Sequence, residues 1–130
     1  MDRIFLDANV LFSAAYRPDA GLLRLWKLPG ATLITSAYAL NEARVNLEEE
    51  QQRERLENLT GSVEMVADPV DFSLPKGVNL PDKDRPILLA AIKAKATHLL
   101  TGDIADFGAY FGRKVEGVLI LPPGDYLRKR

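Results

Sequence analysis

The sequence predicts an α/β protein, a three-layer α/β/α sandwich built around a central parallel sheet of four to five strands. Short β-rich runs alternate along the chain with stretches of helical periodicity, as is typical of a parallel sheet with helices on both faces. Several of these runs are almost entirely apolar, which indicates strands buried on both sides. At 130 residues the chain is long enough for one core, so we expect a single domain over residues 1–130.

The N-terminal part of the chain is predicted to form a strand, a helix and a second strand. Residues 3–6 are a β-rich run that closes at Asp7 to Asn9. Residues 22–28 place leucines and a tryptophan at helical spacing and are followed by a proline and a glycine, which are helix stop signals. Residues 31–35 form the second β-rich run.

One long helix is predicted after the second strand. Ser36 is a suitable N-cap, and the sequence from there to Gly61 contains no glycine or proline and repeats apolar residues among charged ones. Gly61 would end this helix. Residues 62–67 then alternate polar and apolar side chains, as a strand at a sheet edge does.

The C-terminal part is predicted to contain loops, one apolar helix and two buried strands. Residues 68–83 are rich in proline and glycine, which predicts loops. A helix with a nearly continuous apolar face starts at Asp82 or Asp84. Residues 98–101 and 117–122 are buried strands, with a short helix or turn between them.

The composition restricts the chemistry available to this chain. Because cysteine is absent, a metal would need oxygen ligands or the single histidine, His98. The formal net charge of -1 argues against a protein that coats nucleic acid by charge alone, but not against a nuclease with an acidic site. With no long apolar run and no signal-peptide pattern at the start, we expect a cytoplasmic protein without membrane contact.

Four acidic residues are candidates for one site. Asp7 and Asp103 each follow a predicted strand, and the carboxyl ends of parallel strands meet at one edge of a sheet, where ligands bind. Glu42 and Asp84 lie on helices that can point toward the same edge. Two carboxylates about 4 Å apart repel by roughly 4 kcal/mol at an effective dielectric constant near 20, so such a cluster favours bound cations. Oxygen ligands suit Mg²⁺ or Mn²⁺, and a pair of such ions can activate water against a phosphodiester.

Three stretches of the sequence resemble the successive motifs of PIN-domain ribonucleases. They are "FLDANVLFSA", "SAYALNEARVNL" and "LPDKDRPILLAAIKAKATHLLTGDIADF", and the resemblance extends from residue 3 to about residue 121. This family includes the VapC-like toxins of bacterial toxin–antitoxin pairs. The resemblance implies an α/β/α sandwich, dependence on Mg²⁺ or Mn²⁺, and RNA, usually single-stranded, as the substrate. It also implies a homodimer that an antitoxin protein neutralises.

The resemblance also assigns roles to individual residues. It implies that four acids bind the metal and support catalysis: Asp7, Glu42, Asp84 and Asp103. It also implies that Asp106 is a further metal ligand. Asp82 competes with Asp84 for the third position. Asn9 and Thr101 match polar neighbours that help to hold ligands or water.

Simpler interpretations of these acids remain open at the sequence level. Asp82 or Asp84 can act only as a helix N-cap, Asp7 and Asp103 can be turn residues, and Glu42 can be solvated on a charged helix. Two alternative functions follow. One is a non-catalytic PIN-like domain that binds RNA or protein, because Pro86 and the "PDKDRP" spacing can displace Asp84. The other is a phosphotransfer enzyme with Asp7 as the nucleophile.

Overall fold

The strands form one six-stranded sheet in the computed structural model, which describes residues 1–130. The strand order is β3-β2-β1-β4-β6-β5, where the bounds are β1 (Asp2–Leu6), β2 (Ala31–Ser36), β3 (Glu64–Val66), β4 (His98–Leu100), β5 (Lys114–Val115) and β6 (Val118–Leu121). Five strands run parallel, and the two-residue β5, which the sequence did not reveal, pairs antiparallel with β6. The predicted parallel sheet is confirmed.

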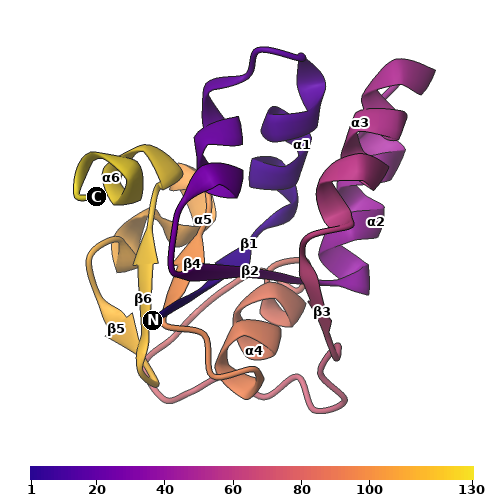
Figure 1. Cartoon of the computed structure of the whole chain (residues 1–130). Coiled ribbons are helices and arrows are strands. Elements are labelled where there is room, and N and C mark those ends of the chain that lie inside the picture. The colour runs from indigo at the N-terminus through magenta and orange to yellow at the C-terminus, as the bar shows by residue number, and fades with distance from the viewer.

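Helices cover both faces of the sheet, as Figure 1 shows. Helices α1, α2 and α3 lie on one side and α4 lies on the other. The helical bounds are α1 (Ala8–Tyr16), η1 (Gly21–Lys27), α2 (Ala37–Asn46), α3 (Glu50–Thr60), α4 (Arg85–Lys93), α5 (Ile104–Phe107), η2 (Gly108–Tyr110) and α6 (Pro123–Arg128), with η marking 3-10 helix. The three-layer α/β/α architecture is therefore confirmed. None of these helices has both the length and the apolar character needed to cross a lipid bilayer.

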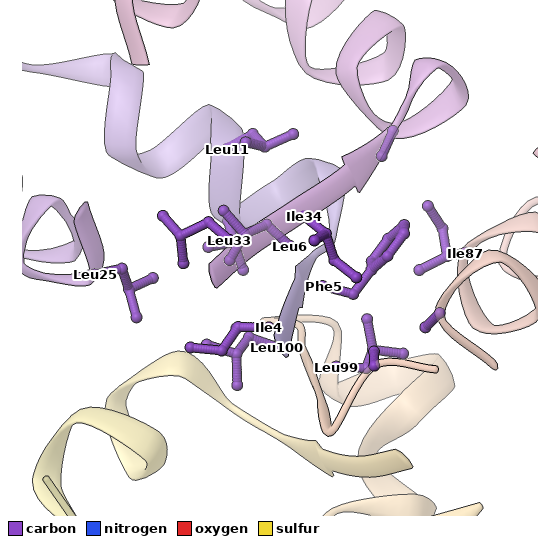
Figure 2. Packing of buried hydrophobic residues seen from close by; sticks show 14 of the residues in the cluster. Ile4, Phe5, Leu6, Leu11, Leu25, Leu33, Ile34, Ile87, Leu99 and Leu100 are labelled. Atoms are coloured by element: carbon purple, nitrogen blue, oxygen red, sulfur yellow. The ribbon is translucent and has the colours of Figure 1, made fainter. Parts of the chain in front are cut away.

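The central strand β1 contributes side chains to both layers of the core. Phe5 points toward Ile87 of α4, whereas Leu6 lies on the side of Leu11 of α1 (Figure 2). All four are at most 2% exposed. Burying each such side chain contributes roughly 1.5–3 kcal/mol, which is why an apolar run without alternation forms a central strand here.

Helix α1 begins directly after β1, where the sequence analysis predicted the end of a strand and no helix. The backbone N–H of Ala8 donates to Asp7 Oδ1 at 2.6 Å, so Asp7 acts as the N-cap. The helix buries Val10, Leu11 and their neighbours Ala14 and Ala15 one turn later against the core. This pairing of apolar positions is the helical signal in the segment.

The prediction of one long helix from Ser36 to Gly61 is wrong. The chain forms two helices, α2 and α3, with a break at residues 47–49. Gln52 Oε1 accepts a hydrogen bond from the Glu49 N–H at 3.1 Å, which completes a capping box at the start of α3. The Arg53 guanidinium donates to the carbonyls of Leu47 and Glu48 at 2.9 Å each. The break therefore needs no glycine or proline, because side chains satisfy the freed backbone groups.

Candidate active site

A cavity of about 400 Å³ opens at the carboxyl end of the parallel strands. It lies where β1 leads into α1 and where α2, α4 and the segment after β4 approach one another. Its polar lining includes the four acids singled out from the sequence together with an aromatic and a basic residue: Asp7, Glu42, Asp84, Asp103, Tyr38 and Lys83. The fold thus brings together acids that are far apart in the chain.

Asp7 is fixed at the bottom of this cavity by hydrogen bonds. The residue is only 4% exposed. Its Oδ2 accepts hydrogen bonds from the Thr101 hydroxyl at 2.7 Å and from Asn9 Nδ2 at 3.3 Å. Burial raises the pKa of the Asp7 carboxyl above its ordinary value, although the bond from Thr101 opposes that rise. Asp7 is therefore both the N-cap of α1 and a buried carboxylate facing the cavity.

Thr101 and Asn9 join the ends of two neighbouring strands. Besides binding Asp7, the Thr101 hydroxyl accepts from the backbone N–H of Asp103 at 3.1 Å. Asn9 Oδ1 accepts from the N–H of Gly102 at 2.8 Å. These bonds set the position of Asp7 relative to Asp103. Thr101 and Asn9 therefore orient the two carboxylates.

Asp84 lacks a hydrogen-bond partner for a buried oxygen. It occupies the N-cap position of α4 but makes no side-chain capping bond, and its Oδ2 is buried without any partner. Burial raises the pKa of Asp84 to about 7, and the neighbouring Asp106 and Asp103 carboxyls add to the rise. Pro86 lies in the first turn of α4 and does not displace Asp84 from the cavity. Helix capping therefore does not account for this residue.

Asp103 and Asp106 complete a group of three carboxyls with Asp84. One carboxylate oxygen from each lies within 4.8 Å of the other two. Asp103 Oδ1 accepts from the Asp106 N–H at 3.0 Å, which holds the short helix α5 in place. The Asp84 carboxyl can donate to Asp106 when it is protonated, which lowers the pKa of Asp106, so that the two carboxyls can share one proton.

Asp82 lies outside the cavity. Its side chain is fully exposed and its carboxylate is 3.5 Å from the Arg85 guanidinium. Of the two candidates for the third acid, the structure places only Asp84 among the other carboxyls.

Glu42 lines the cavity from α2 but is an exposed residue and is not one of the three clustered carboxyls. It lies one turn after Tyr38 on the same helix. Burial raises the pKa of the Tyr38 phenol, and the nearby Glu42 and Asp84 carboxylates raise it further. Glu42 is therefore positioned at the rim of the site.

Two residues of the cavity were not singled out from the sequence. The Lys83 ammonium is 3.5 Å from Asp106 Oδ2 and is the basic group of the cavity. The Tyr38 hydroxyl donates to the Lys83 carbonyl at 2.8 Å and so fixes the chain just before Asp84. The sequence did contain signals for both residues. Lys83 lies between two aspartates just before a predicted helix, and Tyr38 lies one helical turn before Glu42.

The donor set fits a hard divalent cation. All the clustered ligand atoms are carboxylate oxygens, and oxygens on opposite sides of a Mg²⁺ ion are about 4 Å apart. A cation would also supply the missing partner of Asp84 Oδ2. Without a cation, the neighbouring carboxylates repel one another, and this repulsion favours protonation of one of them. The raised pKa of Asp84 agrees with this expectation.

No match was found among curated proteins. The sequence profile of the PIN domain matches residues 3–105.

Two solved structures share the fold. A chain of VapBC2 from Rickettsia felis, a structure bound to a DNA fragment from its promoter, is 18% identical; the match covers 92% of this chain and 98% of that chain, with a TM-score of 0.66. VapC20 from Mycobacterium tuberculosis, a toxin that cleaves the Sarcin-Ricin loop, is 16% identical, with 87% and 97% covered and a TM-score of 0.60.

Proposed function

The chain belongs to the PIN domain family, and on that basis we propose that it is a metal-dependent endoribonuclease. The reaction is hydrolysis of phosphodiester bonds in single-stranded or structured RNA. Water adds across the bond between phosphorus and O3′, so that one product carries a 5′-phosphate and the other a 3′-hydroxyl. The observation that carries the proposal is the buried Asp84 carboxyl, whose Oδ2 has no partner and whose pKa is about 7, beside Asp103 and Asp106.

Mg²⁺ or Mn²⁺ is the cofactor that these residues suit. Asp84, Asp103 and Asp106 would hold it, with Asp7 next to them and Glu42 at the rim of the cavity. When bound, the cation lowers the pKa of water and stabilises negative charge that develops on the phosphate.

The surrounding residues position these acids and the substrate. Thr101 and Asn9 keep the Asp7 carboxylate oriented toward the cavity. The Lys83 side chain is 70% exposed and lies beside Asp106, from where its ammonium can reach a phosphate oxygen of the RNA. Tyr38 keeps Lys83 and Asp84 in place through the Lys83 carbonyl.

We further propose that this nuclease is the toxin of a toxin–antitoxin pair. The similarity in fold to VapC20, a toxin, and to a chain of VapBC2 supports this role. The implied partners are an antitoxin protein and a second copy of the chain, and the implied location is the cytoplasm. If the role is correct, expression of the chain alone should arrest growth, whereas normal growth with soluble, RNA-cleaving protein would contradict it.

RNA cleavage by matched aspartate variants tests the catalytic proposal. Asp7→Asn and Asp84→Asn should each lower the rate of cleavage of a single-stranded RNA with Mg²⁺ by about 100-fold or more, because each removes a charge from the cation site. Asp82→Asn is the control, since it makes the same change on an exposed side chain two residues from Asp84. It should leave the rate unchanged.

The proposal fails if correctly folded Asp7→Asn protein cuts as fast as the unmutated protein. Absence of any metal-dependent cleavage, with no Mn²⁺ binding in titration calorimetry at millimolar concentration, would indicate a non-catalytic binding domain instead.

A further inference from the structure

Helix α1 presents a second face that continues the cavity outward. Its buried face consists of Val10, Leu11 and the alanines that follow them. On another face, Ala8 and Phe12 line the catalytic cavity, and Phe12 also lines a neighbouring hollow of about 230 Å³ together with Ser13, Tyr16 and Arg17. The helix therefore connects the acidic site to a separate surface depression.

Two aromatic rings lie along this face. The ring centroids of Phe12 and Tyr16 are 5.4 Å apart, with an interplanar angle of 37°. Tyr16 is 50% exposed, so half of its surface is open to a ligand. Residues four apart on a helix are separated by roughly 6 Å along its axis, so Phe12 and Tyr16 lie one and two turns beyond Ala8 at the cavity.

The end of α1 that carries Tyr16 is held firmly although its ring is exposed. Gln52 Nε2 and Arg55 Nη2 both donate to the Tyr16 carbonyl, at 3.2 and 3.1 Å. Arg55 Nε also donates to the Ala15 carbonyl at 3.0 Å. Because the backbone that carries Tyr16 is held and its ring lies against Phe12, stacking of a flat group on the ring costs less conformational entropy than it would on a freely moving side chain.

Positive charge lies next to the two rings. Arg17 and Ser13 also line a further hollow of about 380 Å³ with Arg24 and Arg128. Arg24 makes no ion pair, whereas Arg17 is 3.8 Å from Asp19 in an exposed pair and Arg128 pairs with Asp125. Exposed ion pairs of this kind contribute little, so these guanidinium groups can exchange to another anion.

Another hollow beside Tyr16 carries negative charge. Tyr16 and Arg17 line it together with Glu48 and Glu49. An anionic chain leaving the cavity would therefore run along the side of Ser13, Arg17 and Arg24 and away from the glutamates.

We propose that the outer face of α1 holds the single-stranded RNA next to the cleaved bond. Bases stack on Phe12 and Tyr16, and the phosphates of the same nucleotides contact Arg17 and Arg24. Exposed aromatic rings interleaved with arginines are the combination that binds unpaired nucleotides, because bases stack on the rings and guanidinium groups pair with phosphates. This inference rests on the proposed ribonuclease function and adds where the substrate lies.

Binding of a fluorescent ten-nucleotide single-stranded RNA, followed by anisotropy with Mg²⁺, tests this surface. Every protein carries Asp7→Asn so that the RNA stays intact. Tyr16→Ala should weaken binding about tenfold, and Tyr16→Phe, which keeps the ring, should stay within about twofold of the parent. Because binding is measured and not cleavage, the result is separate from the test of the nuclease itself.

Charge variants test the path of the phosphates. Arg24→Ala should reduce the slope of log K against log salt concentration by about 0.7, the value for one lost contact to a single strand. Lys93→Ala is the control, because this exposed lysine lies at the end of α4, on the side where the parallel strand β4 begins. It should leave both affinity and slope unchanged.

Three results would overturn the inference. The first is unchanged RNA affinity in both Tyr16→Ala and Arg24→Ala. The second is equal affinity for a duplex of the same sequence, whose bases cannot stack on the rings. The third is unchanged RNA affinity combined with a smaller mass of Tyr16→Ala in light scattering, which would assign this face to a second copy of the chain.

Discussion

At the scale of single residues, Asp84 determines how the stability of the metal-free protein responds to pH. Its carboxyl has an ordinary pKa of 3.8 in the unfolded chain and a pKa of about 7 in the folded protein, because it is buried. Between these values the folded protein holds a proton that the unfolded chain has released. Without metal, the free energy of unfolding should therefore fall as the pH rises from about 4 to 7 and level off above that range.

Asp84→Asn tests this reasoning through stability. The variant keeps the size of the side chain but removes the buried charge, so in EDTA at pH 7.5 it should be about 1–2 kcal/mol more stable than the unmutated protein. The difference should shrink at pH 5, where Asp84 is protonated. Urea unfolding at both pH values measures it.

Asp82→Asn is again the control for this measurement, because its carboxylate is fully exposed. It should leave the stability nearly unchanged at both pH values. A metal-free protein whose stability rises between pH 5 and 7 would contradict the assignment of Asp84 as a buried acid with a raised pKa. Some decline should persist in Asp84→Asn, since burial also raises the pKa of Asp7.

At the scale of elements, the break between α2 and α3 positions the end of α1. Gln52, at 6% exposure, accepts from the Glu49 N–H and donates to the Tyr16 carbonyl. One side chain thus starts α3 and satisfies a free carbonyl at the last turn of α1.

Gln52→Ala should therefore destabilise the protein by about 1–2 kcal/mol, since it removes the partner of the Glu49 N–H at the start of α3 and one of the two donors to the Tyr16 carbonyl. Gln51→Ala is the matched control, because the neighbouring glutamine is exposed and makes no such bonds. It should change stability by less than about 0.5 kcal/mol. Equal unfolding midpoints for the two variants in urea would show that the break does not depend on Gln52.

Sequence patterns predicted the elements best where burial alone decides them. The strands β1, β4 and β6 are short apolar runs, and the edge strand β3 alternates, so periodicity found them all. The helix break was missed because no glycine or proline marks it. Its actual signal, Glu49 three residues before Gln52, differs from the usual capping box in having glutamate at the first position.

At the scale of the whole molecule, the parallel sheet explains why the acids converge. Strands β1 and β4 are neighbours, and Leu6 pairs with Leu100, so Asp7 and Thr101 leave the sheet side by side. The sequence could predict this edge as the site because each strand end carried a polar residue. It could not predict strand order or register, which depend on contacts between distant segments.

The details of the site depend on those distant contacts as well. Asp82 and Asp84 are equivalent in sequence, and only packing shows that one is exposed and the other is buried. The placement of Lys83 next to Asp106 joins two segments that the sequence gives no reason to pair. The predicted homodimer, the antitoxin partner and the RNA target depend on other molecules, and they stay predictions.

The most direct test of the central claim is an anomalous difference map from a crystal of the protein soaked in Mn²⁺. The account predicts a manganese peak in the cavity, bordered by the carboxylates of Asp84, Asp103 and Asp106, and no such peak in a crystal of Asp84→Asn. A cavity without manganese, at a Mn²⁺ concentration at which the protein cleaves RNA, would contradict the claim that these acids form a metal-dependent nuclease site.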